Sequence, residues 1–271
     1  MTQADWLTFH PYLEPMANFH SEVAALAKFM PNPGIVVPNW EGYRAEFQSG
    51  VPLLLSSGVE LELKTAARTL ATLVDHLASI PLPQSLAEES RTLQTQLHQD
   101  QNKSYRVLQW LVYGDEFATP CSGLLRYLGW TTLASHLRPL LDAFAQWRDD
   151  EKWLRSYCPA CGSPPCMAHL SGTESGRRRL LCCALCGTRW CYRRTGCPFC
   201  ENSDDRQLAV LTAEGEHGLR IDTCQSCGGY LKTYAGNGSE DFFLADWSSI
   251  HLDFLARDHG LKRIAASLYD L

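Results

Sequence analysis

Four Cys-x-x-Cys pairs constrain this 271-residue chain more than any other feature of its sequence. Eleven of the twelve cysteines fall between residues 157 and 230. Eight of them form the pairs Cys158/Cys161, Cys183/Cys186, Cys197/Cys200 and Cys224/Cys227. Two cysteines separated by two residues can bring both sulfurs to one metal ion, so each pair supplies half of a tetrahedral thiolate site. The sequence therefore predicts two four-cysteine metal sites.

The pairs also repeat along the chain. Cys-Pro-Ala-Cys at 158–161 returns as Cys-Pro-Phe-Cys at 197–200, and Cys-x-x-Cys-Gly at 183–187 returns at 224–228. Sequential pairing is the simplest arrangement, in which site one takes the first two pairs and site two takes the last two. Interleaved pairing, of the first pair with the third and the second with the fourth, stays open. An all-thiolate shell suits iron or zinc, and spacing does not choose between them.

The residue that follows each pair indicates a metal-binding knuckle. Gly162, Gly187 and Gly228 can adopt a positive φ, which turns backbone N–H groups toward the sulfurs. Glu201 holds the equivalent position in the third pair. A positive φ there would cost about 1 kcal/mol, unless Asn202 takes over the turn.

Disulfides and a redox dithiol are the competing uses of such pairs. The stretch 1–7 lacks the basic region, apolar run and cleavage site of a secretory signal, so we expect a cytoplasmic protein, where disulfides are rare. A thioredoxin-type motif would be a single pair in a βαβ context rather than four pairs among short strands. Metal binding is the favoured interpretation.

The first 155 residues are predicted to be helical. Apolar residues recur at spacings of three and four between 58 and 80, which predicts a helix with one buried stripe that ends before Pro81. Similar patterns predict helices over 21–30, 86–99, 103–113, 121–129 and 132–147, the last kinked or split at Pro139. Residues 51–55 are expected to be helical or loop core, because Pro52 removes a donor that a strand would need.

Short strands are predicted after the charged stretch 149–152. They cover 167–171, 178–183, 207–211, 218–222 and 230–234, and a last helix follows, capped by Asp246 or Ser248. The expected fold class is therefore α+β multidomain. We predict an α-helical domain over 1–155, a first four-cysteine β module over 156–195, a second over 196–245, and a C-terminal helix within 246–271 that packs back on the body.

Each predicted module is small, so metal should supply much of its folding free energy. A structural thiolate site contributes on the order of 10 to 16 kcal/mol, whereas a module of about forty residues buries little apolar surface. Loss of one site should therefore unfold mainly its own module and leave the helical half folded.

The cysteines outside the pairs are mostly expected to be packing residues. Cys121 reads as a small buried hydrophobe, and Cys182 should face away from its neighbour Cys183 on an alternating strand. Cys166 and His169 form a Cys-x-x-His that could offer substitute ligands to site one.

Other candidate reactive groups are few. Cys191 is the spare thiol best placed to be reactive, and single histidines such as His10 and His251 are expected to be surface or packing residues. No set of histidines and carboxylates is apparent that would leave a metal position open, so the sequence gives no support to hydrolytic metal catalysis.

Charge and hydropathy limit the partners. The formal net charge of -6 argues against a general nucleic-acid binder, and no apolar run approaches the roughly 18 residues that span a membrane. Six arginines gather near the first module, and a solvated hairpin face is favoured over a docking patch for an acidic partner or nucleic acid. They are Arg177, Arg178, Arg179, Arg189, Arg193 and Arg194.

Five segments carry a family resemblance: 158–165 (Cys-Pro-Ala-Cys-Gly-Ser-Pro-Pro), 181–190, 194–200, 224–234 and 250–253. They resemble the FdhE family of formate dehydrogenase accessory proteins, from which Glu201 and Cys166 depart. The resemblance implies a helical N-terminal domain followed by two rubredoxin-like modules, iron in both modules and a cytoplasmic location. It also implies a role in maturing formate dehydrogenase by contact with its catalytic subunit.

The leading hypothesis is a non-enzymatic maturation factor with two iron sites, for which zinc is the alternative metal. Its partner would be the catalytic subunit of formate dehydrogenase, with no membrane insertion, no nucleic acid and no small-molecule substrate. The competing hypotheses are a zinc-ribbon nucleic-acid-binding protein, supported by the run 177–179 with Trp190 and Tyr192, and a rubredoxin-type redox protein.

Overall fold

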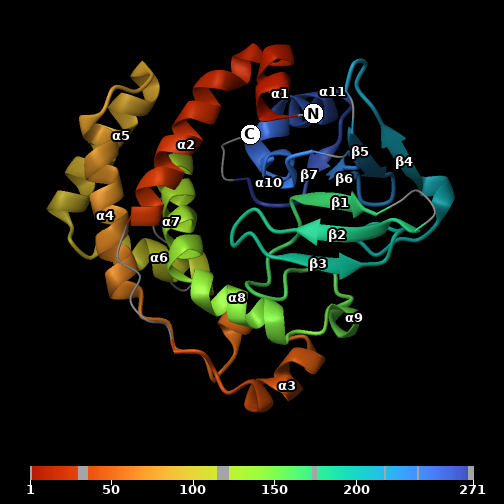
Figure 1. The fold of residues 1–271 in the computed structure, drawn as a ribbon, viewed down its shortest axis with the longest axis horizontal. Helices are drawn as coiled ribbons and strands as arrows, with labels where there is room; N and C mark the ends of the chain where they lie inside the picture. The colour runs from red at the N-terminus through yellow and green to blue at the C-terminus, as the bar shows by residue number, and fades with distance from the viewer. Residues whose placement is uncertain are drawn as a thin grey trace.

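A computed structural model describes residues 2–29, 36–114, 122–172, 176–216, 218–236 and 238–267. Its first half is helical, and its second half is built on a single β-sheet with short helices at its C-terminal end (Figure 1). This arrangement confirms the predicted α+β class. No helix in these ranges is both long and apolar enough to cross a membrane.

The helical half has α4 at its centre. This helix carries the predicted apolar stripe, with Leu70, Leu73, Val74 and Leu77 fully buried, and it packs against α5, α6 and α7. The Glu62 side chain caps it by accepting hydrogen bonds from two backbone N–H groups of its first turn. The helices of this half are α1 (Gln3–Phe9), α2 (Glu14–Phe29), α3 (Trp40–Ser49), α4 (Leu63–Ser79), α5 (Gln84–Gln99), α6 (Lys103–Tyr113), α7 (Gly123–His136), α8 (Arg138–Trp147) and α9 (Asp150–Trp153).

Helix breaks differ from prediction at one place and agree at another. Gly129 was expected to end a helix but lies inside α7, where its missing side chain admits α6: a Cβ there would lie 2.6 Å from Leu111 Cδ1. Pro139 does separate α7 from α8, as predicted. Residues 51–55 form no strand and contain a 3-10 helix over Leu53–Leu55, also as predicted. Cys121 lies outside the described residues.

The second half forms one mixed sheet in the order β3-β2-β1-β6-β5-β4, with β7 beside β6. The five predicted strands are confirmed to within two residues at each end, and the short β3 and β7 were missed. The strands are β1 (Met167–Ser171), β2 (Arg178–Cys182), β3 (Arg189–Tyr192), β4 (Leu208–Leu211), β5 (Leu219–Cys224), β6 (Gly229–Tyr234) and β7 (Lys262–Arg263).

Strands β1 and β6 join the two cysteine-rich segments. They pair in parallel, with Ala168 opposite Thr233, whereas the hairpins on either side are antiparallel. The first cysteine-rich segment contributes β1 to β3 and the second contributes β4 to β6, so both belong to one hydrogen-bonded sheet. The predicted module boundaries at 155/156, 195/196 and 245/246 stay a prediction.

The C-terminal helices pack on the sheet beside the N-terminal helix. They are α10 (Glu240–Phe243), a 3-10 helix over Asp246–Ser249, and α11 (Ile250–Asp258), and Figure 1 shows α1 next to α11. Buried Trp6 of α1 donates its indole N–H to the Ser248 carbonyl at 3.1 Å. The two ends of the chain therefore share one apolar cluster with the sheet.

A buried charge network holds this region in place. Lys232 of β6 is completely buried and places its ammonium 2.8 Å from Asp246 and 2.7 Å from Asp253. Arg263 contacts the same two carboxylates at 2.7 and 2.5 Å. The expected helix cap at Asp246 or Ser248 is wrong, because Asp246 is committed to these two cations and the Ser248 hydroxyl donates to the Ala245 carbonyl.

Candidate metal centres

The eight paired cysteines meet in two groups of four. One group holds Cys158, Cys161, Cys183 and Cys186; the other holds Cys197, Cys200, Cys224 and Cys227. Within each group the four sulfurs lie within 4.8 Å of one another. The grouping is the sequential one, and the interleaved alternative is not formed.

The sulfur positions fit a tetrahedral metal site. In the first group Cys158 lies 3.5 Å from Cys186 and Cys161 lies 3.5 Å from Cys183, while both corresponding distances in the second group are 3.7 Å. A tetrahedron with metal–sulfur bonds of about 2.3 Å has edges of about 3.8 Å. Disulfide bonds would need about 2.05 Å. Metal ligation by these residues stays a prediction, and their donor set suits iron or zinc.

All four knuckles share one backbone turn. In each, the N–H after the second cysteine donates to the carbonyl of the first, as in Gly162 to Cys158 at 2.9 Å. Three of these positions are glycines with φ between 70° and 79°. Further N–H groups approach the sulfurs: Phe199 donates to Cys197 Sγ and Gly229 to Cys227 Sγ, both at 3.4 Å. Such donors stabilise thiolate charge.

Glu201 adopts the turn that glycine adopts elsewhere. Its φ is 59°, so Asn202 does not take over, and the Asn202 side chain instead accepts a hydrogen bond from the Asp204 N–H at 3.0 Å. Arg193 donates to the Glu201 carbonyl at 2.8 Å. These contacts therefore hold the Glu201 backbone in the left-handed region, although Glu201 carries a Cβ.

Glu201→Gly is expected to stabilise the protein by up to about 1 kcal/mol, because glycine adopts positive φ without steric cost. Gly228→Ala is the matched change of opposite sign. Its φ is 70° and a Cβ would meet nothing within 4 Å, so only backbone strain acts, costing about 1 kcal/mol. Urea unfolding of both variants measures the two shifts, and equal signs would refute a shared knuckle geometry.

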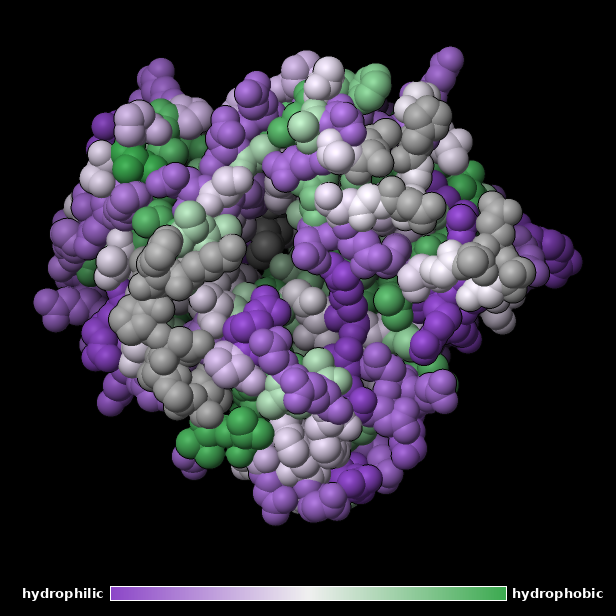
Figure 2. Space-filling view, viewed as in Figure 1, coloured by the Kyte–Doolittle hydropathy of each residue, from purple (hydrophilic) through white to green (hydrophobic). Residues whose placement is uncertain are grey.

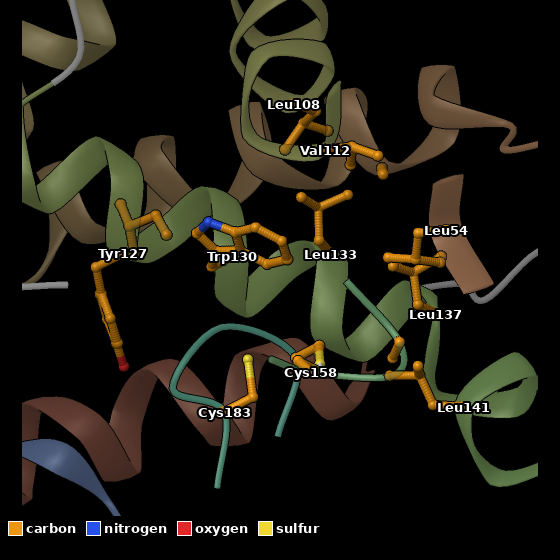
Figure 3. Close-up of a cluster of buried hydrophobic side chains, with 14 of the residues drawn as sticks. Leu54, Leu108, Val112, Tyr127, Trp130, Leu133, Leu137, Leu141, Cys158 and Cys183 are labelled. Carbon is orange, nitrogen blue, oxygen red and sulfur yellow. Dashed lines mark hydrogen bonds between the residues drawn. The ribbon is translucent and has the colours of Figure 1, made fainter. Parts of the chain in front are cut away.

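Site one is built into the core of the helical half. Cys158 and Cys186 are fully buried and belong to the same apolar cluster as the helices. Figure 3 shows Cys158 and Cys183 beneath Leu133 and Leu137 at the end of α7. The first knuckle is also tied to the helical half by two backbone hydrogen bonds of 2.9 Å, from residues 53 and 54 to residues 159 and 160.

A groove runs beside site one between the helical half and the sheet. Its volume is about 940 Å³, and Figure 2 shows it as the hollow near the centre of that face. Segment 182–187, which carries the second knuckle, lines one wall. Aromatic side chains of Tyr127, Trp130 and Trp247 line other parts, with Arg138 at the edge.

Site two lies at the surface. Cys200 is exposed and Cys227 is partly exposed, while Cys197 and Cys224 are buried. Burial acts to raise the pKa of Cys224, but the Cys227 N–H and a hydrogen bond with Cys200 outweigh it and lower that pKa to about 7. In site one, burial raises the pKa of Cys158 well above its usual value. Because Cys200 is exposed and Cys227 is partly exposed, a ligand or partner can reach site two more readily than site one.

The remaining described cysteines lie outside both groups. Cys182 packs in the second apolar cluster, opposite Cys183, as predicted. Cys166 lies in that cluster too, and His169 stacks on Tyr234, so the Cys-x-x-His substitute for site one is wrong.

Cys191 is buried rather than open to solvent. Its sulfur accepts a hydrogen bond of 2.9 Å from Arg178 Nη2. These observations give no support to its selection as the most reactive spare thiol.

Part of the arginine cluster is engaged in the fold or with acidic neighbours. Arg179 is buried and donates to the Gly196 carbonyl at 2.8 Å, and Arg189 pairs with the carboxylates of residues 240 and 241. Arg178, Arg193 and Arg194 remain exposed. The basic surface is thus smaller than the sequence suggested and borders site two through the 193–197 segment.

A third group of potential ligands was missed. His10, Glu216 and His251 place one ligand atom each within 4.8 Å of one another. The expectation that no histidine and carboxylate set exists is therefore wrong. These residues are separated by most of the chain and have no motif spacing, so only the folded arrangement reveals them.

Comparisons with known proteins point to one family. No protein-family model matches the chain. A protein named FdhE homolog from Aquifex aeolicus (strain VF5) is 34% identical over 137 residues, which cover 49% of this chain and 48% of the relative. Another from Pseudomonas aeruginosa is 40% identical over 118 residues, 40% of this chain and 38% of that relative. The chain thus spans about half the length, or less, of these curated relatives.

A solved structure extends the likeness to the fold. The crystal structure of the FdhE protein from Pseudomonas aeruginosa superimposes with a TM-score of 0.63 over 95% of this chain and 88% of that chain, at 23% identity. The shared fold therefore includes both the helical half and the sheet.

Proposed function

We propose that this chain, which belongs with the FdhE proteins by sequence and by fold, is an accessory protein that contacts the catalytic subunit of a formate dehydrogenase during its assembly. In this proposal it acts in the cytoplasm, catalyses no reaction of its own and holds two iron ions through its eight paired cysteines. The observation that carries the proposal is the pair of four-thiolate groups within this shared fold.

The two sites would have different roles. Iron in a four-thiolate shell supplies a one-electron centre or a structural cross-link. Site one, mostly buried in the core, joins the helical half to the sheet, whereas site two presents Cys200 to solvent. The exposed arginines at 193 and 194 lie beside the third knuckle and would attract an acidic partner surface toward site two.

Metal content is the first test of this proposal. Elemental analysis of protein prepared without added metal should find two ions per chain in these eight cysteines, and ferric iron bound to thiolates should give a red colour with charge-transfer absorption. A colourless protein with two zinc ions would replace iron in the proposal. One ion per chain, or disulfides across the pairs, would contradict the two-site proposal itself.

Partner binding is the second test. Arg194→Glu should slow association with the formate dehydrogenase catalytic subunit by about tenfold at low salt, because reversal of a rim charge acts mainly on electrostatic steering. Arg68→Glu, an exposed arginine of α4, is the matched control and should have no effect. Surface plasmon resonance at several salt concentrations measures both variants.

Formate dehydrogenase activity in cells that lack this protein completes the test. Normal activity with no complex, together with nucleic-acid binding that weakens steeply with salt, would favour the zinc-ribbon alternative. Lost activity and a salt-dependent complex with the catalytic subunit would support the proposal.

A further inference from the structure

Three side chains from distant parts of the chain converge beside the N-terminus. His10 follows α1, Glu216 lies between β4 and β5, and His251 lies in α11. Their side chains are 16%, 5% and 19% exposed, so the group is largely buried but open to solvent at the two rings. An imidazole–carboxylate–imidazole set differs chemically from the two thiolate groups and lies outside them.

The donor atoms of this group lie close enough together to share one ion. Glu216 Oε1 lies 3.2 Å from His10 Nε2 and 2.8 Å from His251 Nε2. Ligands bound at about 2.0 to 2.2 Å around a tetrahedral ion lie about 3.4 Å apart. In the described part of the chain, Glu216 Oε2 and both ring nitrogens of His251 are buried without a hydrogen-bond partner, although His251 Nε2 lies 2.8 Å from Glu216 Oε1. Buried polar atoms normally find a partner, and a metal ion would supply one.

Neighbouring side chains hold the His10 ring in position. Its Nδ1 lies 3.0 Å from the Tyr12 hydroxyl, which leaves Nε2 facing the carboxylate. The His10 ring packs on Trp6 at 4.1 Å and stacks on the His251 ring at 4.8 Å between centroids. Outer contacts of this kind commonly fix the orientation and tautomer of a metal-binding histidine.

We propose that His10, Glu216 and His251 bind a divalent transition-metal ion of the zinc class. Two imidazoles and one carboxylate suit zinc and its first-row neighbours, and three protein ligands leave a position for water or for a partner's side chain. The ion would link the N-terminal segment to α11 and to the loop before β5. It requires nothing of the thiolate sites and does not depend on the proposed function.

The test is a Zn²⁺ and Co²⁺ titration of the full-length protein with its cysteine sites filled, after dialysis against a weak chelator. Elemental analysis should show one ion bound beyond those in the cysteine groups. Co²⁺ in this site should give visible ligand-field bands without the near-ultraviolet charge-transfer absorption of thiolate ligation, which separates it from exchange into the cysteine groups.

Variants assign the extra ion to its ligands. Glu216→Gln and His251→Asn should each weaken its binding by more than about 100-fold, and Tyr12→Phe, which removes only the outer contact, by about 10- to 100-fold. His98→Asn is the matched control, because His98 also pairs with one carboxylate, Asp75, at 2.9 Å but belongs to no group of three potential ligands among the described residues. It should bind the ion as the unmodified protein does.

Two results would overturn the assignment. One is the absence of any further bound ion in the unmodified protein. The other is unchanged binding in Glu216→Gln, a variant of nearly identical size whose fold is verified by its cysteine-bound metal. Either would leave these residues as a hydrogen-bonding and ion-pair cluster.

Discussion

Cys158→Ser is expected to release the metal of site one and to unfold the helical half together with the sheet. A structural four-thiolate site contributes on the order of 10 to 16 kcal/mol, as much as the roughly 5 to 15 kcal/mol that stabilises a typical protein. Cys158 is fully buried in the apolar cluster of the helices. Loss of its metal therefore leaves free thiols and a polar hydroxyl inside that core.

The matched variant is Cys200→Ser in site two. Cys200 is exposed, so its loss should release one metal ion while the helical half keeps its thermal transition. Metal analysis with far-ultraviolet circular dichroism melting separates the two outcomes. If Cys158→Ser melts like Cys200→Ser, site one does not support the helical core. From the sequence alone, each variant would be expected to unfold only its own module, because the sequence does not show where the first knuckle packs.

Lys232→Met is expected to destabilise the protein by about 3 to 5 kcal/mol, the usual cost of removing one partner from a buried ion pair. Methionine matches the length of the lysine stem, so the main change is the lost charge. Asp246 and Asp253, whose side chains are each 4% exposed, would then keep Arg263 as their shared cation. Urea unfolding monitored by tryptophan fluorescence measures the loss.

Arg206→Met provides the control for that measurement. Arg206 pairs with Asp204 at 2.9 Å, but its side chain is 89% exposed. Such surface pairs contribute about 0 to 1 kcal/mol. A loss below about 1 kcal/mol in Lys232→Met would mean that solvent or rearrangement compensates the buried carboxylates.

The same network gives stability a defined pH dependence. Burial acts to raise the pKa of Asp246, but the charges of Lys232 and Arg263 outweigh it and hold that pKa below its usual value. A lowered pKa in the folded state means that the contribution is fully present above the unfolded pKa of about 4. It is lost as the pH falls through the lower, folded-state pKa, so acid should weaken the C-terminal packing.

Local patterns predicted the local elements well. The helix of 103–113 and the strand of 167–171 match α6 and β1, because periodicity and terminating glycines act over a few residues. The break expected at Gly129 failed for a non-local reason, since that glycine is needed where α6 approaches α7. The parallel pairing of β1 with β6 also depends on residues far apart, and no short pattern encodes it.

The same division applies to the sites. The cysteine groups could be predicted because two cysteines separated by two residues, followed by a tight turn, already supply half of each site. The burial of site one was not predictable, since it depends on the packing of residues 53 and 54 against the first knuckle. His10 and His251 were assigned to packing or the surface because nothing near either one in the sequence indicates a second ligand.

The position of β6 within the sheet also affects the order in which the two metal sites are completed during synthesis of the chain. Roughly sixty residues separate β1 from its parallel neighbour β6, so at about 5 to 20 residues per second β1 waits several seconds on the ribosome with one edge unpaired. Site one is completed early in that interval by Cys183 and Cys186, whereas site two is completed by Cys224 and Cys227 just before β6. We therefore expect site one to acquire its metal first, on a nascent chain whose sheet is still half built.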